Sequence, residues 1–195
     1  ADKDAYVRFV QNISRRMHEN GFTVNVDLAP KTSATQPGTL YEGHDYAALG
    51  RAADTVLLMT YEWGYTYGPP MAVAPINQVR RVVEYALTEI DNRKIYMGIP
   101  NYGYDWPLPF EKGKTRARGI GNETAVRIAS ENGAEILFDE TAQTPYFEYT
   151  QGGTKHVVWF EDIRSIQAKF ALIDEFNLRG GGYWNLMNPF TQNFM

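Results

Sequence analysis

The chain of 195 residues contains no cysteine, so it forms no disulfide and has no thiol to serve as nucleophile or metal ligand. It also lacks any run of 18 apolar residues, and its first residues, ADKDAYVRF, do not resemble a signal peptide. We therefore expect no membrane partner. The missing cysteine does not assign a compartment, because a mature secreted bacterial protein often lacks cysteine too.

Positive charge is also scarce, since the formal net charge is −4 at pH 7. A protein without a basic surface is a poor candidate for binding nucleic acid. The three histidines, His18, His44 and His156, lie far apart with no second ligand at metal spacing. Gly119 and Gly121 follow no predicted strand and lack a third glycine, so a dinucleotide site is not expected. We expect neither a metal nor a cofactor.

Aromatic residues are abundant, at 14% of the chain, and 13 of them are tyrosines. They are concentrated in LLMTYEWGYTYGPP, residues 57–70. A buried strand there ends in Tyr61, Glu62 and Trp63 without a polar transition. A carboxylate among aromatic rings at a strand end is unusual for ordinary core and suggests a functional site.

Helices and strands alternate along most of the chain. The strand patterns FTVNVDLAP, TVLLMTY, KIYMGIP and GGGYWNL are apolar runs, as expected for parallel strands covered on both faces. Amphipathic patterns predict helices over 4–20, 45–53, 76–91 and 161–177, the last with Ile163, Ile166, Phe170 and Ile173 on its buried face.

Residues 103–160 interrupt this alternation. They contain a hairpin pattern that turns near Gly152 and Gly153, and a short helix pattern over 122–133. We interpret 103–160 as a small α+β insertion subdomain between barrel segments 1–102 and 161–195.

Four α/β units amount to half of a TIM (β/α)8 barrel, which typically needs about 250 residues. The predicted fold class is therefore α/β, half a barrel with an insertion. A flavodoxin-like sheet is the alternative, although PKTSATQPG makes a poor phosphate or flavin loop after the first strand.

Functional groups of a barrel collect where its strands end. Those positions hold carboxylates, rings and amides, and no arginine or lysine: Asp27, Tyr61, Glu62, Asn101, Tyr102, Trp184 and Asn185. Rings stack on the apolar faces of sugars, and amides bond to their hydroxyl groups. This set favours a glycan over a phosphate ligand.

Four motifs in order resemble glycoside hydrolase family 18, the chitinase-like barrel enzymes. The segment MTYE, Met59 to Glu62, is similar to the family's M-x-Y-D signature. GIPNYGYDW resembles its next strand and loop, GGGYWNL its last strand, and residues 103–160 its insertion domain. MTYEWGYTYGPPMAVAPINQV is most similar to the branch of bacterial spore cortex-lytic and germination N-acetylglucosaminidases. The resemblance covers almost the whole chain.

The resemblance implies the C-terminal half of a barrel and substrate-assisted retaining hydrolysis, in which the acetamido oxygen of the sugar attacks the anomeric carbon. By motif position, Tyr61 and Glu62 are the expected catalytic residues. Tyr61 would donate to that acetamide, and Glu62, which replaces the family's aspartate with one extra methylene, would bond polar groups at the same subsite. Trp184 would form the floor under the sugar. Other expected substrate-binding residues are Asn101, Tyr102, Trp63 and Asp27, although a structural hydrogen bond is an equal alternative for Asp27.

The family's general acid is the glutamate that ends D-x-x-D-x-D-x-E, and this chain contains no Asp-x-Glu. We expect that glutamate shortly upstream of Ala1 in the parent protein, so the 195 residues alone should be inactive. The expected partner is an N-acetylated glycan, either peptidoglycan or a chitin-type oligosaccharide. The expected location is extracellular, in the cell wall or the spore coat or cortex of a bacterium.

Three functions remain open at this point. The chain is part of a glycosidase, or a family 18-like carbohydrate-binding protein that has lost its acid, or an unrelated α/β domain with another ligand. The identity of the upstream residue at the general-acid position distinguishes the first two functions.

Half a barrel leaves strand edges near 23–29 and 181–186 without neighbours. Such edges pair with other chains or with a missing N-terminal half. We predict that the isolated 195-residue chain self-associates or melts at low temperature, as measured by sedimentation velocity and calorimetry. A monodisperse monomer with a sharp melting transition would contradict the half-barrel interpretation.

Overall fold

The computed structural model describes residues 2–194, so the outermost residues of the predicted barrel segments, 1 and 195, lie outside the described residues. The chain divides into two compact units. Unit 1 comprises the chain up to Thr60 together with Arg80–Gly98 and Leu172–Gly182. Unit 2 comprises Tyr61–Val79, Ile99–Ala171 and the chain from Tyr183 onward.

The sheet of unit 1 has the strand order β1-β2-β3-β9, and β2 pairs in parallel with both β1 and β3. Leu28, Val56 and Ile95 are fully buried, as the apolar runs predict. A Cβ on Gly182 would lie 2.4 Å from Leu57 Cδ1, so only glycine fits there. The strands are β1 (Asn25–Leu28), β2 (Thr55–Leu58), β3 (Ile95–Pro100) and β9 (Gly180–Trp184).

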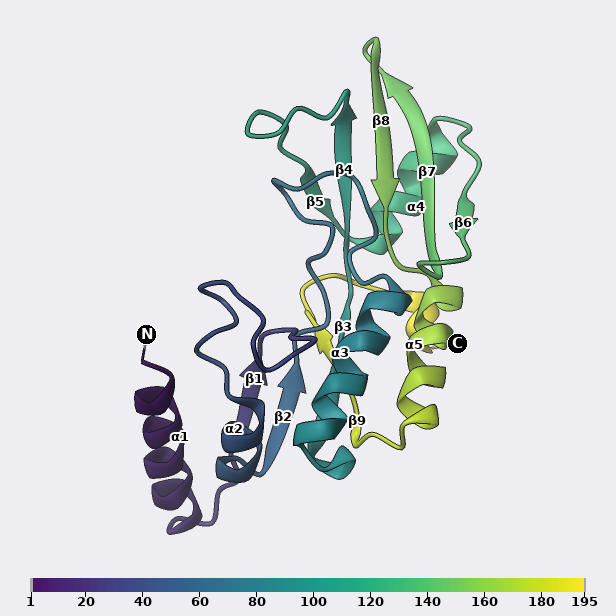
Figure 1. Ribbon diagram of the computed structural model, residues 1–195. Coiled ribbons are helices and arrows are strands. Elements are labelled where there is room, and N and C mark those ends of the chain that lie inside the picture. Colours follow the sequence, from purple (N-terminus) through teal and green to yellow (C-terminus); the bar gives the residue numbers. More distant parts are fainter. Residues whose placement is uncertain (1, 195) are drawn as a thin grey trace. The chain divides into compact units, whose positions relative to one another are not determined.

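Four helices accompany these strands, each within its predicted range to within one residue (Figure 1). Asp45 begins α2 by accepting a hydrogen bond from Ala48 N at 2.9 Å. Gly21, with φ of 77°, follows the end of α1 as expected for a left-handed residue after a helix. The helices are α1 (Lys3–His18), α2 (Tyr46–Ala52), α3 (Ile76–Glu89) and α5 (Ile163–Glu175), with the short 3₁₀ helix η1 (Asn92–Lys94) before β3.

The predicted buried face of α5 is partly wrong. Ile166 and Ile173 are buried, but Ile163 and Phe170 are exposed. Lys169 is fully buried instead, with Nζ 2.8 Å from Glu161 Oε2. Hydrophobic periodicity assigns charged side chains to the outer face, so it could not anticipate an internal ion pair.

Unit 2 contains a five-stranded antiparallel sheet of order β5-β4-β8-β7-β6. Gly152 and Gly153, both at positive φ, form the turn between β7 and β8, as predicted for the hairpin. Figure 1 shows β4, β8 and β7 side by side. The elements are β4 (Gly103–Leu108), β5 (Arg118–Ile120), α4 (Asn122–Glu131), β6 (Leu137–Asp139), β7 (Thr144–Gln151), β8 (Thr154–Trp159) and the 3₁₀ helix η2 (Thr191–Phe194).

The two faces of this sheet have different partners. On one face Phe147 and Val158 pack with Ala125 and Ile128 of α4. The other face carries an aromatic cluster that includes Tyr102, Tyr104 and Trp106 and packs against Val73. Successive residues of β4 therefore point into two separate environments.

Asp105 of β4 is a buried charge with three donors. His156 Nδ1 and the Tyr149 hydroxyl both lie 2.8 Å from its carboxylate oxygens, and Arg118 lies 3.2 Å away. A buried carboxylate is tolerated only when it is paired and hydrogen-bonded in this way.

Between residues 2 and 194, no helix is both long enough and apolar enough to cross a membrane.

Burial raises the pKa of the Glu161 carboxyl, and the neighbouring Lys169 ammonium opposes that shift. The other oxygen, Oε1, is buried without a hydrogen-bond partner among the described residues. Lys169 is thus the main compensation for this buried charge.

We predict that Lys169→Met destabilises the protein by about 3–5 kcal/mol near neutral pH, the usual effect of removing one partner of a buried ion pair. Without the ammonium, the pKa of Glu161 rises further above its ordinary value of 4.5. A folded state that binds more protons than the unfolded state loses stability as pH rises, so the deficit shrinks on acidification. Urea unfolding at several pH values measures this.

The control is Glu161→Gln combined with Lys169→Met, which leaves no charge to titrate. Relative to this double variant, the single variant should lose stability as pH rises, because only the single variant keeps a Glu161 carboxyl that titrates. Equal pH profiles for the single and double variants would contradict the assignment.

Candidate functional site

The site begins with the loop that follows β2. Trp63 N donates to Val73 O at 3.1 Å and Gly64 N to Ala72 O at 2.9 Å, so the two sides of the loop pair with each other. A Cβ on Gly64 would lie 2.1 Å from Met71 O, and therefore this approach requires glycine. The pairing holds Glu62 in the left-handed region, with φ of 70°. Non-glycine residues are uncommon there, and such residues often occur at functional sites.

Glu62 accepts two phenol hydrogen bonds on one carboxylate oxygen. Oε1 lies 2.5 Å from the Tyr102 hydroxyl and 2.9 Å from the Tyr104 hydroxyl. The two rings meet edge to face, with centroids 5.7 Å apart and planes at 87°. The loop is thereby tied to the residues at the start of the insertion sheet.

Both phenols remain protonated at physiological pH. Burial, followed by the hydrogen bond to Glu62 and its negative charge, raises the pKa of Tyr102 far above its ordinary value. The same causes raise the pKa of Tyr104 to about 12. Because a protonated phenol donates a hydrogen bond, the Glu62 carboxylate keeps both donors at this pH.

These groups line one pocket of about 420 Å³ in unit 2. Trp184 is 54% exposed, so its indole is available to a ligand. Tyr61 also packs partly against the aromatic cluster of the insertion sheet. The lining residues are Tyr61, Glu62, Tyr102, Tyr104, Gly119, Ile120, Gly121, Trp184, Asn185 and Asn188.

Asn101 does not line the pocket, although it was expected in the groove wall. Its side chain is buried, and Nδ2 donates to Asn185 O at 3.0 Å and Asn188 O at 2.7 Å. Its backbone N donates to Trp184 O at 2.7 Å. Asn101 supports the loop that carries the pocket's tryptophan.

Trp63 and Asp27 also lie outside the pocket lining. Trp63 is half-buried and belongs to the paired loop described above. Asp27 lies on β1 in unit 1, where its carboxylate accepts from Asn25 Nδ2 at 2.9 Å and faces a separate hollow beside α1. The structure thus brings together Tyr61, Glu62, Tyr102 and Trp184.

Three parts of the pocket were not predicted from the sequence: Tyr104, the Gly119–Gly121 segment and Asn188. In the sequence, Gly119 and Gly121 resemble only an incomplete dinucleotide motif. Gly119 lies on β5, which has three residues, too few for a periodic signal, and Gly121 follows that strand. Tyr104, two residues beyond Tyr102, could have been found from the alternation of side chains along a strand.

The pocket suits an uncharged, hydroxyl-rich or amide-bearing ligand. It offers phenol donors, a carboxylate, side-chain amides and an indole face, and its lining contains no arginine or lysine. Within the part of the chain that the structure describes, no group of three or more His, Cys, Asp or Glu side chains is placed to hold a metal ion.

We predict that Glu62→Gln lowers the pKa of Tyr104 from about 12, because a neutral amide no longer repels the phenolate. Burial keeps that pKa above the ordinary value of 10.0. Carbon-13 NMR of the tyrosine Cζ atoms against pH measures this, with Tyr104→Phe identifying the resonance.

Tyr149 is the internal control, because burial and Asp105 raise its pKa to about 12 without Glu62. It should titrate unchanged in Glu62→Gln. An unchanged Tyr104 would contradict the coupling to Glu62.

Comparison with known proteins identifies relatives over the whole chain. The model of the family described as glycosyl hydrolases family 18 matches residues 1–188. The chain is 53% identical, over 195 residues, to a cortical fragment-lytic enzyme of Bacillus subtilis (strain 168). That match covers 100% of this chain and 45% of the relative.

Two solved structures of spore cortex-lytic enzyme SleL are similar. The Bacillus megaterium QM B1551 protein has a TM-score of 0.95 and 48% identity, covering 100% of this chain and 44% of that one. The Bacillus cereus protein has a TM-score of 0.95 and 44% identity, covering 99% and 45%. The chain therefore spans less than half the length of these relatives. The matches confirm the α/β fold class and the predicted resemblance.

Proposed function

The chain belongs to glycosyl hydrolases family 18, and from this premise we propose that it supplies the acetamide-binding side of a glycosidase site for N-acetylglucosamine-containing glycans. The family match excludes the third alternative, an unrelated α/β domain. The activity proposed is that of the full protein, since the chain spans 45% of its relative from Bacillus subtilis.

The arrangement around Glu62 is the observation that carries this proposal. One carboxylate oxygen, held by two buried phenols, lies beside Tyr61 in a pocket that also exposes the indole of Trp184. Pockets of a few hundred Å³ with a flat ring and a few fixed polar groups are typical of small-ligand sites. A pyranose would stack its apolar face on Trp184 and direct its acetamide toward Tyr61 and Glu62.

The reaction would use the substrate as its own nucleophile. The acetamido carbonyl oxygen attacks the anomeric carbon, the glycosidic bond breaks, and the leaving oxygen takes a proton. Water then attacks the anomeric carbon on the face from which the leaving group departed, breaks the bond to the acetamide oxygen and gives up a proton, so the configuration is retained. Tyr61 would hold the carbonyl oxygen in line, and Glu62 would stabilise the positive charge that spreads over the acetamide.

The leaving group needs a proton donor that this pocket does not provide. Glu62 is the one acid among the lining residues, and it is engaged as an acceptor by Tyr102 and Tyr104. A general acid has to donate instead. We propose that the acid is the family's glutamate, absent from these 195 residues, and that they are inactive alone.

We further propose that the sheet β1-β2-β3-β9 is the C-terminal half of the family's barrel. Parallel pairing of β1, β2 and β3, with each strand followed by helical or loop connections, supports this. The antiparallel sheet lies between β3 and β9 in sequence, where a chitinase-type insertion is expected.

The named relatives suggest the substrate and the location. Proteins 53% and 48% identical to the chain are called cortical fragment-lytic and spore cortex-lytic enzymes. We propose peptidoglycan fragments of the spore cortex as substrate, and the cortex as the place of action.

A non-catalytic glycan-binding protein is the second candidate. The one acid that lines the pocket acts as a hydrogen-bond acceptor. This favours the binding function, because binding a glycan needs no proton donor. The two functions differ in product formation but share the same ligand contacts.

We predict that the full protein releases reducing ends from N-acetylglucosamine-containing peptidoglycan fragments with retained configuration. Tyr61→Phe should lower kcat by about 10²–10³, the usual effect of removing one donor to a developing charge, with a smaller change in KM. Reducing-end assays and NMR of the first product anomer measure this.

Tyr67→Phe is the matched control, since Tyr67 is exposed in the same loop and does not line the pocket. It should leave kcat unchanged. Saturable binding without cleavage would support the second candidate, and neither binding nor cleavage would refute both.

A further inference from the structure

The loop 184–188 has little apolar packing of its own. Leu186 is 94% exposed and Met187 is 86% exposed, yet Trp184, Asn185 and Asn188 all line the pocket. A segment without buried apolar contacts opens easily unless polar bonds restrain it. The bonds from Asn101 to the carbonyls of Trp184, Asn185 and Asn188 are such restraints.

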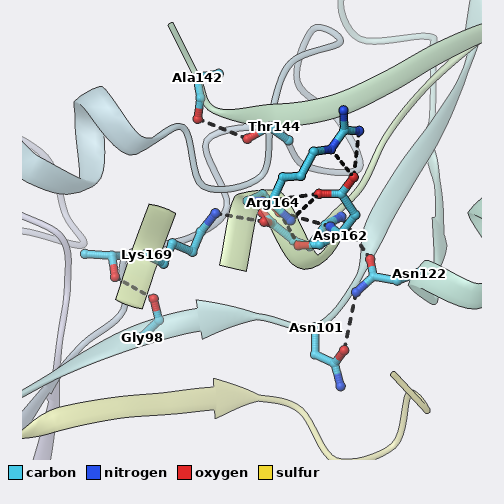
Figure 2. Close-up of polar contacts among 11 residues, drawn as sticks. Gly98, Asn101, Asn122, Ala142, Thr144, Asp162, Arg164 and Lys169 are labelled. Carbon is cyan, nitrogen blue, oxygen red and sulfur yellow. Dashed lines mark hydrogen bonds and ion pairs between the residues drawn. The ribbon is translucent and has the colours of Figure 1, made fainter. Parts of the chain in front are cut away.

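The Asn101 amide has a partner on its other side. Asn122 Nδ2 lies 3.4 Å from Asn101 Oδ1, a long hydrogen bond between two buried side chains (Figure 2). Asn122 Oδ1 in turn accepts from Glu161 N at 3.0 Å. The contacts form one line from Glu161 through Asn122 and Asn101 to the loop.

The orientations of both amides are fixed by the groups at the two ends of this line. Glu161 N–H can only donate, so the oxygen of Asn122 faces it and the NH₂ of Asn122 faces Asn101. Asn101 then presents its oxygen to Asn122 and its NH₂ to the loop carbonyls, which can only accept. A flip of either amide would place like groups against each other.

The starting point of the line is rigid. Glu161 is fully buried and ion-paired with Lys169 of α5 at 2.8 Å. Asn122 is the first residue of α4 and follows Gly121, which itself lines the pocket. The insertion helix, the segment between β8 and α5 that contains Glu161, and the pocket loop therefore share one set of amides.

We propose that Asn101 and Asn122 are positioning residues that orient the Trp184–Asn188 loop for sugar binding. This inference rests on the proposed function for its ligand. Asn122 does not line the pocket, and its hydrogen bond to Asn101 is the contact through which it would act on the loop. The first residue of the insertion helix thus influences the pocket loop from behind, whereas β4 and β5 line the pocket directly.

Asn122→Asp tests the proposal by replacing a single side-chain group of Asn122, the NH₂ donor. Aspartate keeps the oxygen that accepts from Glu161 N and replaces the donor with an oxygen facing Asn101 Oδ1. We expect the full protein to bind the N-acetylglucosamine trisaccharide about tenfold more weakly, as for one lost hydrogen bond. We also expect faster hydrogen exchange at the backbone amides of 184–188. Titration by tryptophan fluorescence and exchange mass spectrometry measure these effects.

Asn132→Asp is the matched control. Asn132 lies at the other end of α4, where its Nδ2 donates to Ile128 O at 2.8 Å. The same substitution there should leave both the affinity and the exchange of 184–188 unchanged. Equal effects from the two variants would overturn the proposal.

If Asn122→Asp unfolds below the working temperature, Asn101→Ala carries the same test without adding a charge. Unchanged exchange at 184–188 in that variant would overturn the proposal. A wild-type protein that binds no trisaccharide would refute the proposed function, while the exchange comparison would still decide whether the line of amides positions the loop.

Discussion

The carboxylate of Glu62, fixed by two phenols, is the contact on which the candidate site depends. Tyr102 and Tyr104 approach the same oxygen from two positions along one extended segment. That geometry holds the loop after β2 against the start of the insertion sheet. Because burial and the carboxylate keep both phenols protonated, the contact persists over the whole physiological pH range.

Buried polar groups contribute to the organisation of the remainder of unit 2, beside its two apolar clusters. Asp105 has three donors, Glu161 has Lys169, and the Asn101 and Asn122 amides connect backbone groups of three segments. Burying each of these groups costs free energy unless its hydrogen-bond partners are in place, so only one arrangement of the surrounding residues is stable. Such groups specify geometry, which a binding site needs more than it needs extra stability.

Much of the fold could be predicted because its signals are local. Apolar runs identified β1, β2, β3 and β9, and two glycines identified the hairpin turn. The buried face of α5 could not be predicted, because Lys169 is neutralised by a residue outside the helix. In the pocket, motif positions indicated Tyr61, Glu62, Tyr102 and Trp184. They could not separate Asn101 behind the pocket from residues that line it, since one amide can serve either purpose.

Because the two faces of β4 have different partners, insertions and deletions within this strand are disruptive. Tyr104 points to the pocket and its neighbour Asp105 to the buried cluster with His156, because side chains alternate along a strand. Inserting or deleting one residue upstream in β4 would exchange these two faces, placing a carboxylate beside Glu62 and a phenol against His156. The turn at Gly152 and Gly153 carries no such constraint. Length variation among descendants of this sequence should accumulate at that turn and be absent from β4.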